Sequence, residues 1–263
     1  MRSALLNIMI QAATKAGRSL SKDFGEVENL QVSVKGPADF VSNADKRAEQ
    51  IVFEELQKAR PTYGFLGEEG TEVKGSDGQH RWIVDPLDGT TNFRHGIPMF
   101  AVAIALERNQ EIVASVIYNP VMDELYTAEK GGGAWLNDRK RLRVGGRKHL
   151  ADCVIVTGIN SRARASDLLQ LRQLNQINPA VAGIRRTGSA AIDLAWVAAG
   201  RFDGYWEAGL APWDVAPGSL LLREAGGILS DFSGGAGAIW NGEVIAGNEM
   251  IQGQLLKLIK TVK

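Results

Sequence analysis

The sequence lacks most of the features that would set it apart from an ordinary globular protein. Its one cysteine, Cys153, excludes a disulfide within the chain, so we expect a reducing compartment such as the cytoplasm. No apolar run is long enough to span a membrane, and the N-terminal pattern is that of an amphipathic helix rather than a signal peptide. Neither sign of charge is in excess, because lysine plus arginine and aspartate plus glutamate both number 30. A net charge of zero argues against binding to nucleic acid or to a membrane surface through bulk charge.

The glycine-rich motifs of nucleotide-binding proteins are also missing, since neither a G-x-G-x-x-G nor a P-loop pattern occurs. Three strand-like runs at residues 100–107, 111–118 and 124–129 are instead joined by tight polar turns, which indicates antiparallel sheet. In the first run large apolar residues alternate with alanine, which predicts helices packed closely on the alanine side. After residue 150 strands and helices alternate, so we expect two subdomains, 1–150 and 151–263, within one compact unit.

Two helices are expected before the first long strand. Apolar residues at helical spacing predict a helix over residues 3–22. Val32 and Val34 alternate with polar residues, which suggests a short strand. Ser42 and Asp45 have the spacing of a capping box, so a second helix should begin there and end before Pro61.

The strongest chemical signal comes where a strand-like apolar run stops at two carboxylates. The run ends at Asp85, Pro86 cannot donate to a strand ladder, and Asp88 follows. Gly89 and Thr90 then suit the start of a helix. Two acids beside free helix N–H groups could hold a hard cation and a phosphate. Taken singly, each acid also fits an ordinary turn, with Asp88 capping the helix.

Four other positions have both a structural and a chemical interpretation. Glu68 belongs to an acidic turn, and Asp45 and Asp214 fit helix caps on local grounds. The turn at Gly188 and Ser189 leads into a helix and therefore offers free N–H groups to a ligand. For the acids, the local pattern alone favours the structural roles.

Residues 82–93 match at every position a signature of the inositol monophosphatase family, W-[IV]-[VI]-D-P-[LI]-D-G-T-T-N-F. Further segments resemble that family in the family's own order: P-x-D-x-V-[ST]-x-x-D at 37–45, G-E-E at 67–69, R-R-T-G-S-A-A at 185–191, and W-D-x-A with E-A-G-G at 213–227. The segment at 185–191 looks most like the bacterial branch. The resemblance implies an α+β fold, a layered α-β-α-β-α sandwich with a large, mostly antiparallel N-terminal sheet and a smaller C-terminal sheet.

The activity that the resemblance implies is Mg²⁺-dependent hydrolysis of myo-inositol monophosphate by attack of a metal-activated water. Two ions, or three in some members, are held by carboxylates and one backbone carbonyl. By this resemblance Glu68, Asp85 and the Leu87 carbonyl bind the first ion. Asp85, Asp88 and Asp214 bind the second, and a weaker third ion lies near Glu68. All of these ligands are oxygen atoms, which Mg²⁺ prefers.

The remaining site residues also follow from the resemblance. Glu68 and Thr90 position the attacking water, and Asp45 orients Thr90. The Glu207 carboxylate accepts hydrogen bonds from substrate hydroxyls and repels a second phosphate, so we expect a polyol monophosphate rather than a bisphosphate. The substrate-binding set that the family implies comprises Asp88, Gly89, Thr90, Gly188, Ser189, Ala190, Glu207 and Asp214.

Several alternatives stay open. The same chemistry could act on fructose bisphosphate, histidinol phosphate or a nucleotide 3′-phosphate. A protein-binding role with the transcription machinery, which the bacterial branch can show, could exist beside catalysis. Family members are usually dimers and are commonly inhibited by lithium, so we expect a homodimer. Pro217 replaces the small residue usual in the family; in a first helical turn it would be harmless, although it could narrow the pocket.

Overall fold

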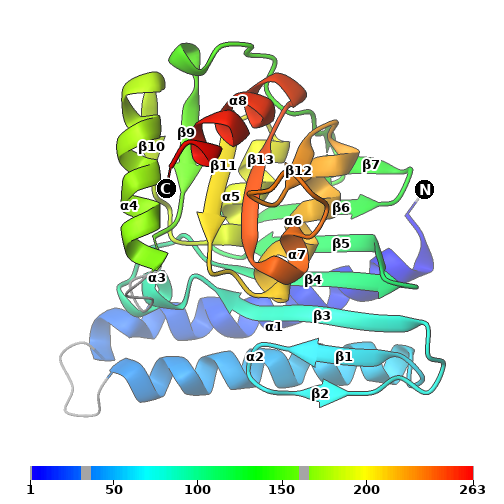
Figure 1. The fold of residues 1–263 in the computed structure, drawn as a ribbon. Helices are drawn as coiled ribbons and strands as arrows, with labels where there is room; N and C mark the ends of the chain where they lie inside the picture. The colour runs from blue at the N-terminus through cyan, green and yellow to red at the C-terminus, as the bar shows by residue number, and fades with distance from the viewer. Residues whose placement is uncertain (1, 31–36, 160–165, 263) are drawn as a thin grey trace.

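The fold is described from a computed structural model, over residues 2–30, 37–159 and 166–262 (Figure 1). Helix α1 spans Ala4–Leu30, so it runs well past the predicted end at residue 22. Phe24 helps to extend the helix, because its ring packs against those of Phe93 and Phe100, with centroids 5.6 Å and 5.0 Å away. The predicted strand at Val32 and Val34 lies outside the described residues.

Helix α2 spans Pro37–Ala59, which makes the predicted start at Ser42 wrong. Ser42 and Asp45 therefore lie within the helix rather than at its start. A proline is tolerated in the first turn of a helix, because the N–H that it lacks would have no partner there. Pro37 can therefore be the first residue of α2, five residues before the predicted start.

The larger sheet has eight strands in the order β2-β1-β3-β4-β5-β6-β7-β8. The pair β1 and β3 is parallel and the other neighbours are antiparallel, as a mostly antiparallel sheet requires. The three predicted runs are confirmed as β4, β5 and β6. The strand bounds are β1 Gly64–Gly67, β2 Glu72–Val73, β3 His80–Asp88, β4 Ala101–Arg108, β5 Glu111–Asn119, β6 Glu124–Glu129, β7 Gly133–Leu136 and β8 Lys140–Arg141.

The two faces of β4 enter different hydrophobic cores. Val102, Ile104 and Leu106 pack with residues of α1 and α2. The alanines at 101, 103 and 105 pack with residues of α5 (Ala190–Ala198) and α6 (Pro212–Glu224). The prediction of helices on the alanine side is therefore confirmed.

The smaller sheet has five strands in the order β10-β9-β11-β13-β12 and lies on the other side of α5 and α6. Helices α4 (Ser166–Ile177) and α8 (Glu249–Lys260) cover its outer face through a third core. Figure 1 shows the resulting α-β-α-β-α layers, which confirm the predicted fold class. The other bounds are α3 Thr90–Arg94, η1 Leu150–Asp152, β9 Val154–Thr157, η2 Asn178–Ala180, β10 Gly183–Arg185, β11 Gly204–Ala208, β12 Ile228–Ser230, α7 Ala238–Asn241 and β13 Glu243–Gly247.

Two local features bear on the earlier expectations. Cys153 is fully buried, and burial raises the pKa of its thiol to about 11, which fits an inert side chain. Pro217 lies in the second turn of α6 rather than the first, where it removes one helical hydrogen bond; its carbonyl accepts a bond from the Ser115 hydroxyl at 2.6 Å. Across the described ranges, no helix has both the length and the apolar character needed to cross a membrane.

Candidate metal centre

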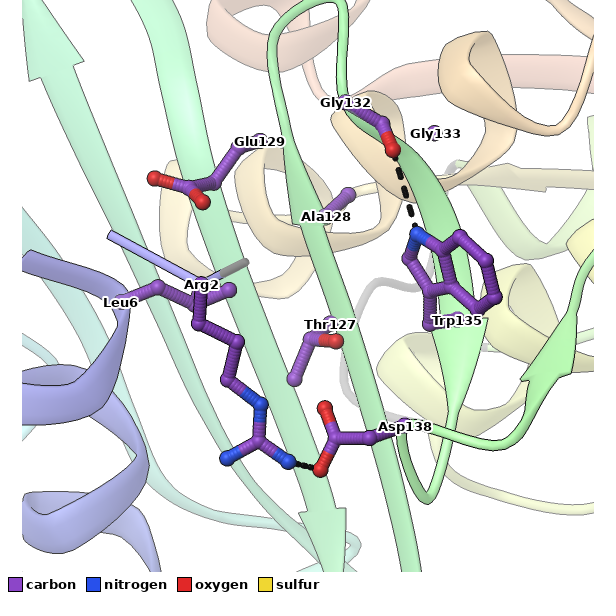
Figure 2. Close-up of a pocket in the computed structure, with 9 residues that line it drawn as sticks. All are labelled: Arg2, Leu6, Thr127, Ala128, Glu129, Gly132, Gly133, Trp135 and Asp138. Carbon is purple, nitrogen blue, oxygen red and sulfur yellow. Dashed lines mark hydrogen bonds and ion pairs between the residues drawn. The ribbon is translucent and has the colours of Figure 1, made fainter.

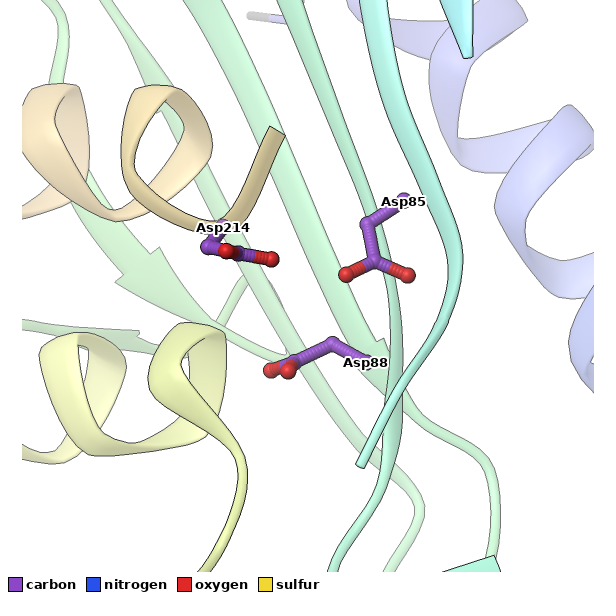
Figure 3. Close-up of side chains that lie close together, drawn as sticks. All are labelled: Asp85, Asp88 and Asp214. Atoms are coloured by element: carbon purple, nitrogen blue, oxygen red, sulfur yellow. The ribbon is translucent and has the colours of Figure 1, made fainter. Parts of the chain in front are cut away.

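Three carboxylates converge at the end of β3 and the start of α6. One oxygen each of Asp85, Asp88 and Asp214 lies within 4.8 Å of the others, and Figure 3 shows the side chains pointing toward one another. Asp85 and Asp88 are buried. More than 120 residues of chain separate the first two acids from the third, so the fold itself assembles the cluster.

An irregularity in β3 places Asp85 and Asp88 in one cluster. On a regular strand residues three apart point to opposite faces. Here the pairing with β4 shifts between Asp85, opposite Ala103, and Asp88, opposite Ala101. Pro86 cannot donate to the ladder, and the Asp85 carboxylate instead accepts the Leu87 N–H at 2.9 Å. The predicted strand end thus becomes a bent segment with both acids on the same side.

Burial and mutual repulsion oppose ionisation of these acids. The pKa of Asp85 is raised well above its ordinary value, mainly by burial and then by Glu68 and Asp88. Burial followed by repulsion from Asp214 raises the pKa of Asp88 to about 7. Burial is also the main cause that raises the pKa of Asp214 to about 6. A positive charge beside these groups would favour their ionised form, so the cluster fits a divalent cation.

The N-terminus of α5 holds Asp88. The Ser189 hydroxyl donates to Asp88 Oδ2 at 2.5 Å, and the Ala191 N–H donates to the same oxygen at 2.8 Å. Ser189 is also the N-cap of α5, because its hydroxyl oxygen accepts the Ile192 N–H at 3.3 Å. The predicted substrate turn at Gly188–Ala190 is therefore joined directly to the metal centre, and the Ser189 hydroxyl is engaged with Asp88.

Glu68 lies where β1 ends, at the rim of the cluster. The residue is exposed to solvent, yet its carboxyl group is close enough to Asp85 to share a hydrogen bond. Partial burial of that carboxyl group raises its pKa, the bond with Asp85 lowers it, and the charge of Asp88 raises it further. Glu68 is thus placed beside the buried acids, on their solvent side.

Asp45 lies on α2 and is buried. Its Oδ1 is buried without a hydrogen-bond partner among the described residues, an unusual state for a carboxylate. Burial, followed by repulsion from Glu68, raises the pKa of Asp45 to about 9. The Thr90 hydroxyl donates to the Leu87 carbonyl at 3.1 Å, so the orientation of Thr90 by Asp45 stays a prediction. The Leu87 carbonyl keeps a second lone pair for a ligand.

Gly89 begins α3, as the sequence predicted. Its φ of 95° is in the left-handed region, and a Cβ there would lie 2.7 Å from the Met99 carbonyl oxygen. No other residue could adopt this conformation without both backbone strain and a clash. The chain can therefore turn sharply from the two acids into α3 only at a glycine.

Glu207 on β11 faces the same cluster. Its pKa is raised to about 7, mainly by burial; the bond from Tyr205 opposes this, and the charges of Asp88 and Asp214 add to it. The Tyr205 hydroxyl donates to Glu207 Oε2 at 2.6 Å. At Gly158 a Cβ would lie 2.0 Å from Glu207 Oε1, so only glycine leaves room for this carboxylate. Glu207 is thus a fixed, partly buried acid beside the metal centre.

Sequence reasoning missed several residues that position the site, among them Tyr205 and Gly158. Asn92 is a third: its amide donates to the carbonyls of Met99 at 2.7 Å and Thr187 at 2.8 Å, which joins α3 to the substrate turn. The only signal for Asn92 was its place in the family signature.

A separate hollow lies away from these acids. This cavity of about 400 Å³ holds an ion pair between Arg2 and Asp138, with Trp135 on its wall (Figure 2). None of the predicted site residues lines it. This hollow is therefore separate from the candidate site, which the cluster of acids locates.

Comparison with known proteins agrees with this geometry. A model of the inositol monophosphatase family matches residues 1–263. A protein of Mesorhizobium japonicum named inositol-1-monophosphatase is 64% identical, over 98% of this chain and 97% of its own length. A protein of Escherichia coli named Nus factor SuhB is 42% identical, over 94% of this chain and 92% of its own. The crystal structure of extragenic suppressor protein suhB from Bartonella henselae superposes with a TM-score of 0.91 at 58% identity, covering 98% of this chain and 99% of that one.

Proposed function

The chain belongs to the inositol monophosphatase family of phosphatases, and we propose that it hydrolyses myo-inositol monophosphate to inositol and phosphate with Mg²⁺ as cofactor. The observation that carries the proposal is the convergence of Asp85, Asp88 and Asp214 within 4.8 Å. Carboxylates this close repel one another, and divalent cations are the groups that most directly compensate them.

The donor atoms support Mg²⁺ as the cation. Two ions, or three if another binds beside Glu68, would be held by oxygen atoms alone. These atoms are the carboxylate oxygens of Glu68, Asp85, Asp88 and Asp214 and the carbonyl oxygen of Leu87. Mg²⁺ prefers such oxygen ligands, and no cysteine or histidine belongs to the acidic group. When bound, the ions would activate the attacking water and stabilise the leaving oxygen.

The chain's own residues would align the reactants. The N–H groups of Gly89 and Thr90 would hold the phosphate at the start of α3. Asp45, whose Oδ1 has no partner among the described residues, is available to accept a hydrogen bond from Thr90 or from the attacking water. Glu68 lies on the solvent side of the cluster, where it would help to orient that water.

Glu207 supports a polyol monophosphate over the other substrates considered. A carboxylate accepts hydrogen bonds from hydroxyl groups and repels a second phosphate. The charges of Asp88 and Asp214 already act on Glu207, which strengthens that repulsion. Fructose bisphosphate therefore fits this side of the site less well, and histidinol phosphate or a nucleotide 3′-phosphate would present fewer hydroxyl groups to it.

Phosphate release from a panel of monophosphates and fructose bisphosphate, with and without Mg²⁺, tests the proposal. We expect inositol monophosphate to be hydrolysed fastest, and no release in EDTA. Glu207→Ala should lower kcat/KM for inositol monophosphate by about 10- to 100-fold, as loss of a charge-assisted hydrogen bond of roughly 1.5–3 kcal/mol implies. The same variant should lose less activity on fructose bisphosphate, because repulsion is removed as well. Unchanged turnover of inositol monophosphate by Glu207→Ala would contradict the proposal.

Other expectations stay predictions. They are the homodimer, the cytoplasmic location, inhibition by lithium and an additional role with the transcription machinery. The last is supported only by relatives that carry the name Nus factor SuhB.

A further inference from the structure

A second buried acid lies on α2, one turn after Asp45. Glu49 is only 2% exposed, and its carboxylate binds the backbone of the segment that follows β1. The Glu69 N–H donates to Glu49 Oε2 at 2.8 Å, and the Thr71 N–H donates to Oε1 at 3.1 Å. Both oxygens of a buried side chain are therefore occupied by the two residues around Gly70.

These bonds fix the segment that carries Glu68. On its other side the Glu68 N–H donates to the Val84 carbonyl at 3.2 Å, which extends the pairing of β1 with β3. The next N–H along the chain, that of Glu69, is the one bound by Glu49. Although the Glu68 carboxyl group is partly buried beside Asp85, the residue as a whole is exposed and gains little from packing. Its position therefore depends on backbone bonds immediately before and after it.

Gly67 gives an independent indication of this contact. A Cβ at Gly67 would lie 2.2 Å from Glu49 Oε2 and 2.8 Å from the Phe65 ring. Its φ is not in the left-handed region, so glycine is needed here for space rather than for conformation. Because Gly67, the first residue of the G-E-E element, has no side chain, the Glu49 carboxylate can occupy the space beside it and bind the loop.

We infer that Glu49 is a positioning residue, which holds the Glu68 loop so that the Glu68 carboxylate stays at the metal centre. The inference rests on the proposed function, because it takes Glu68 to be a metal ligand. Charge supports it: burial is the main cause of the raised pKa of Asp45, Glu68 and Glu69, and the Glu49 carboxylate adds repulsion at all three. Glu49 thereby also adds to the negative potential that attracts a cation.

Metal binding without substrate tests the inference directly. Glu49→Gln keeps the shape of the side chain but replaces one acceptor oxygen with an NH₂ group, which cannot accept the loop N–H. We expect Mg²⁺ binding, measured by titration calorimetry, to weaken by about 10- to 100-fold, the usual effect of losing a residue that orients a metal ligand. In turnover, the Mg²⁺ concentration for half-maximal rate should rise by a similar factor, whereas kcat at saturating Mg²⁺ should change less.

Glu224→Gln is the matched control. Glu224 also uses both carboxylate oxygens to accept backbone N–H groups, those of Gly131 and Gly133 at 2.8 Å each. It lies ten residues after Asp214 on α6, about 15 Å along the helix. Thermal unfolding should show both variants destabilised, but only Glu49→Gln should lose Mg²⁺ affinity.

Gly67→Ala provides a second route to the same result. The added methyl group should displace the Glu49 carboxylate and weaken Mg²⁺ binding while leaving the acid in place. Wild-type affinity in folded Glu49→Gln or Gly67→Ala would overturn the inference, as would an equal loss in Glu224→Gln. If the wild-type protein hydrolyses none of the monophosphates but Glu49→Gln still weakens Mg²⁺ binding, the proposed substrate is wrong and the positioning role stands.

Discussion

At the scale of single residues, the acids of the metal centre serve structure and chemistry together. Asp85 accepts the Leu87 N–H, and Asp214 accepts the Ala211 N–H at 2.7 Å as a cap of α6. Asp88 uses one oxygen for the start of α5. Asp85 and Asp214 each bind a nearby backbone N–H, and Asp88 binds the start of a distant helix, so in each acid one oxygen is engaged within the protein. Asp214 caps its helix as the structural interpretation predicts, whereas Asp88 binds the start of α5 and does not cap α3. Metal binding by these acids stays a prediction, which the local pattern could not separate from a structural role.

The raised pKa values predict how the metal-free protein responds to pH. Asp88 and Asp214 have folded pKa values of about 7 and about 6, above the ordinary value of 3.8. The folded state thus holds protons more tightly than the unfolded state, so this stability is fully present below about pH 4 and is lost progressively as pH rises from there through the folded pKa values, up to about pH 7. In EDTA the thermal midpoint should fall over this window, by about 2–4 °C for each kcal/mol lost. Mg²⁺ binds the ionised acids, so its stabilising effect should grow over the same window.

Asp88→Asn is the test of that assignment. The variant keeps an oxygen that can accept from Ser189 and Ala191 but has no charge to lose. Its metal-free midpoint should vary less between about pH 4.5 and 7, which lies between the unfolded and the folded pKa of Asp88, and should exceed that of wild type at the upper end. A pH dependence as steep as that of the wild type, measured by circular dichroism, would assign the effect to other groups.

At the scale of elements, three segment ends meet at the centre: the bent end of β3 and the first turns of α5 and α6. Asp88 joins β3 to α5 through Ser189, and Asn92 joins α3 to the turn at Thr187. The turn proposed to bind substrate and the acid proposed to bind metal therefore share one hydroxyl group, that of Ser189. A change at the start of α5 should affect both stability and metal affinity.

Ser189→Ala tests this link. The helix loses its N-cap, which should cost about 0.5–2 kcal/mol of stability, and Asp88 loses a charge-assisted hydrogen bond. We expect a lower thermal midpoint together with several-fold weaker Mg²⁺ binding. Asn248→Ala is the control, because Asn248 caps α8 by accepting the Ile251 N–H at 3.0 Å and has no bond to the metal centre. An equal loss of Mg²⁺ affinity in Asn248→Ala would show that the effect is general destabilisation.

The sequence predicted long, strongly patterned elements better than short ones. The alternation in β4 predicted both its strand and the two layers that cover it, because those positions are buried on both faces. The start of α2 was missed because Ser42 and Asp45 match a capping box, yet the helix already includes Pro37. Strands such as β8 and β10 were missed because two or three residues are too few to show the alternation of apolar and polar residues that is typical of a strand. Only their pairing with neighbouring strands identifies them.

The site shows the same limit. Its acids were found through motifs, whereas Glu49, Tyr205 and Gly158 were not, because their roles are contacts between segments far apart in the chain. Nothing in the local sequence around Glu49 distinguishes it from the other acids of an amphipathic helix. Short patterns can thus predict candidate metal ligands, but they do not predict the residues that contact and position those side chains.

At the scale of the whole molecule, the site is made by all three inner layers. The larger sheet supplies Asp85 and Asp88, the central helices supply Asp214 and Ser189, and the smaller sheet supplies Glu207. One hydrophobic core contains residues from both sides of position 150. The division into subdomains at 1–150 and 151–263 stays a prediction, but the metal centre needs both parts to be docked.

Anomalous diffraction from crystals soaked in Mn²⁺, which accepts the same oxygen ligands as Mg²⁺, tests the central claim most directly. We predict at least one strong peak about 2.1 Å from carboxylate oxygens of Asp85, Asp88 and Asp214 together, and a second that includes Glu68 and the Leu87 carbonyl. Absence of any peak among these oxygens, with manganese bound elsewhere on the protein, would contradict the account.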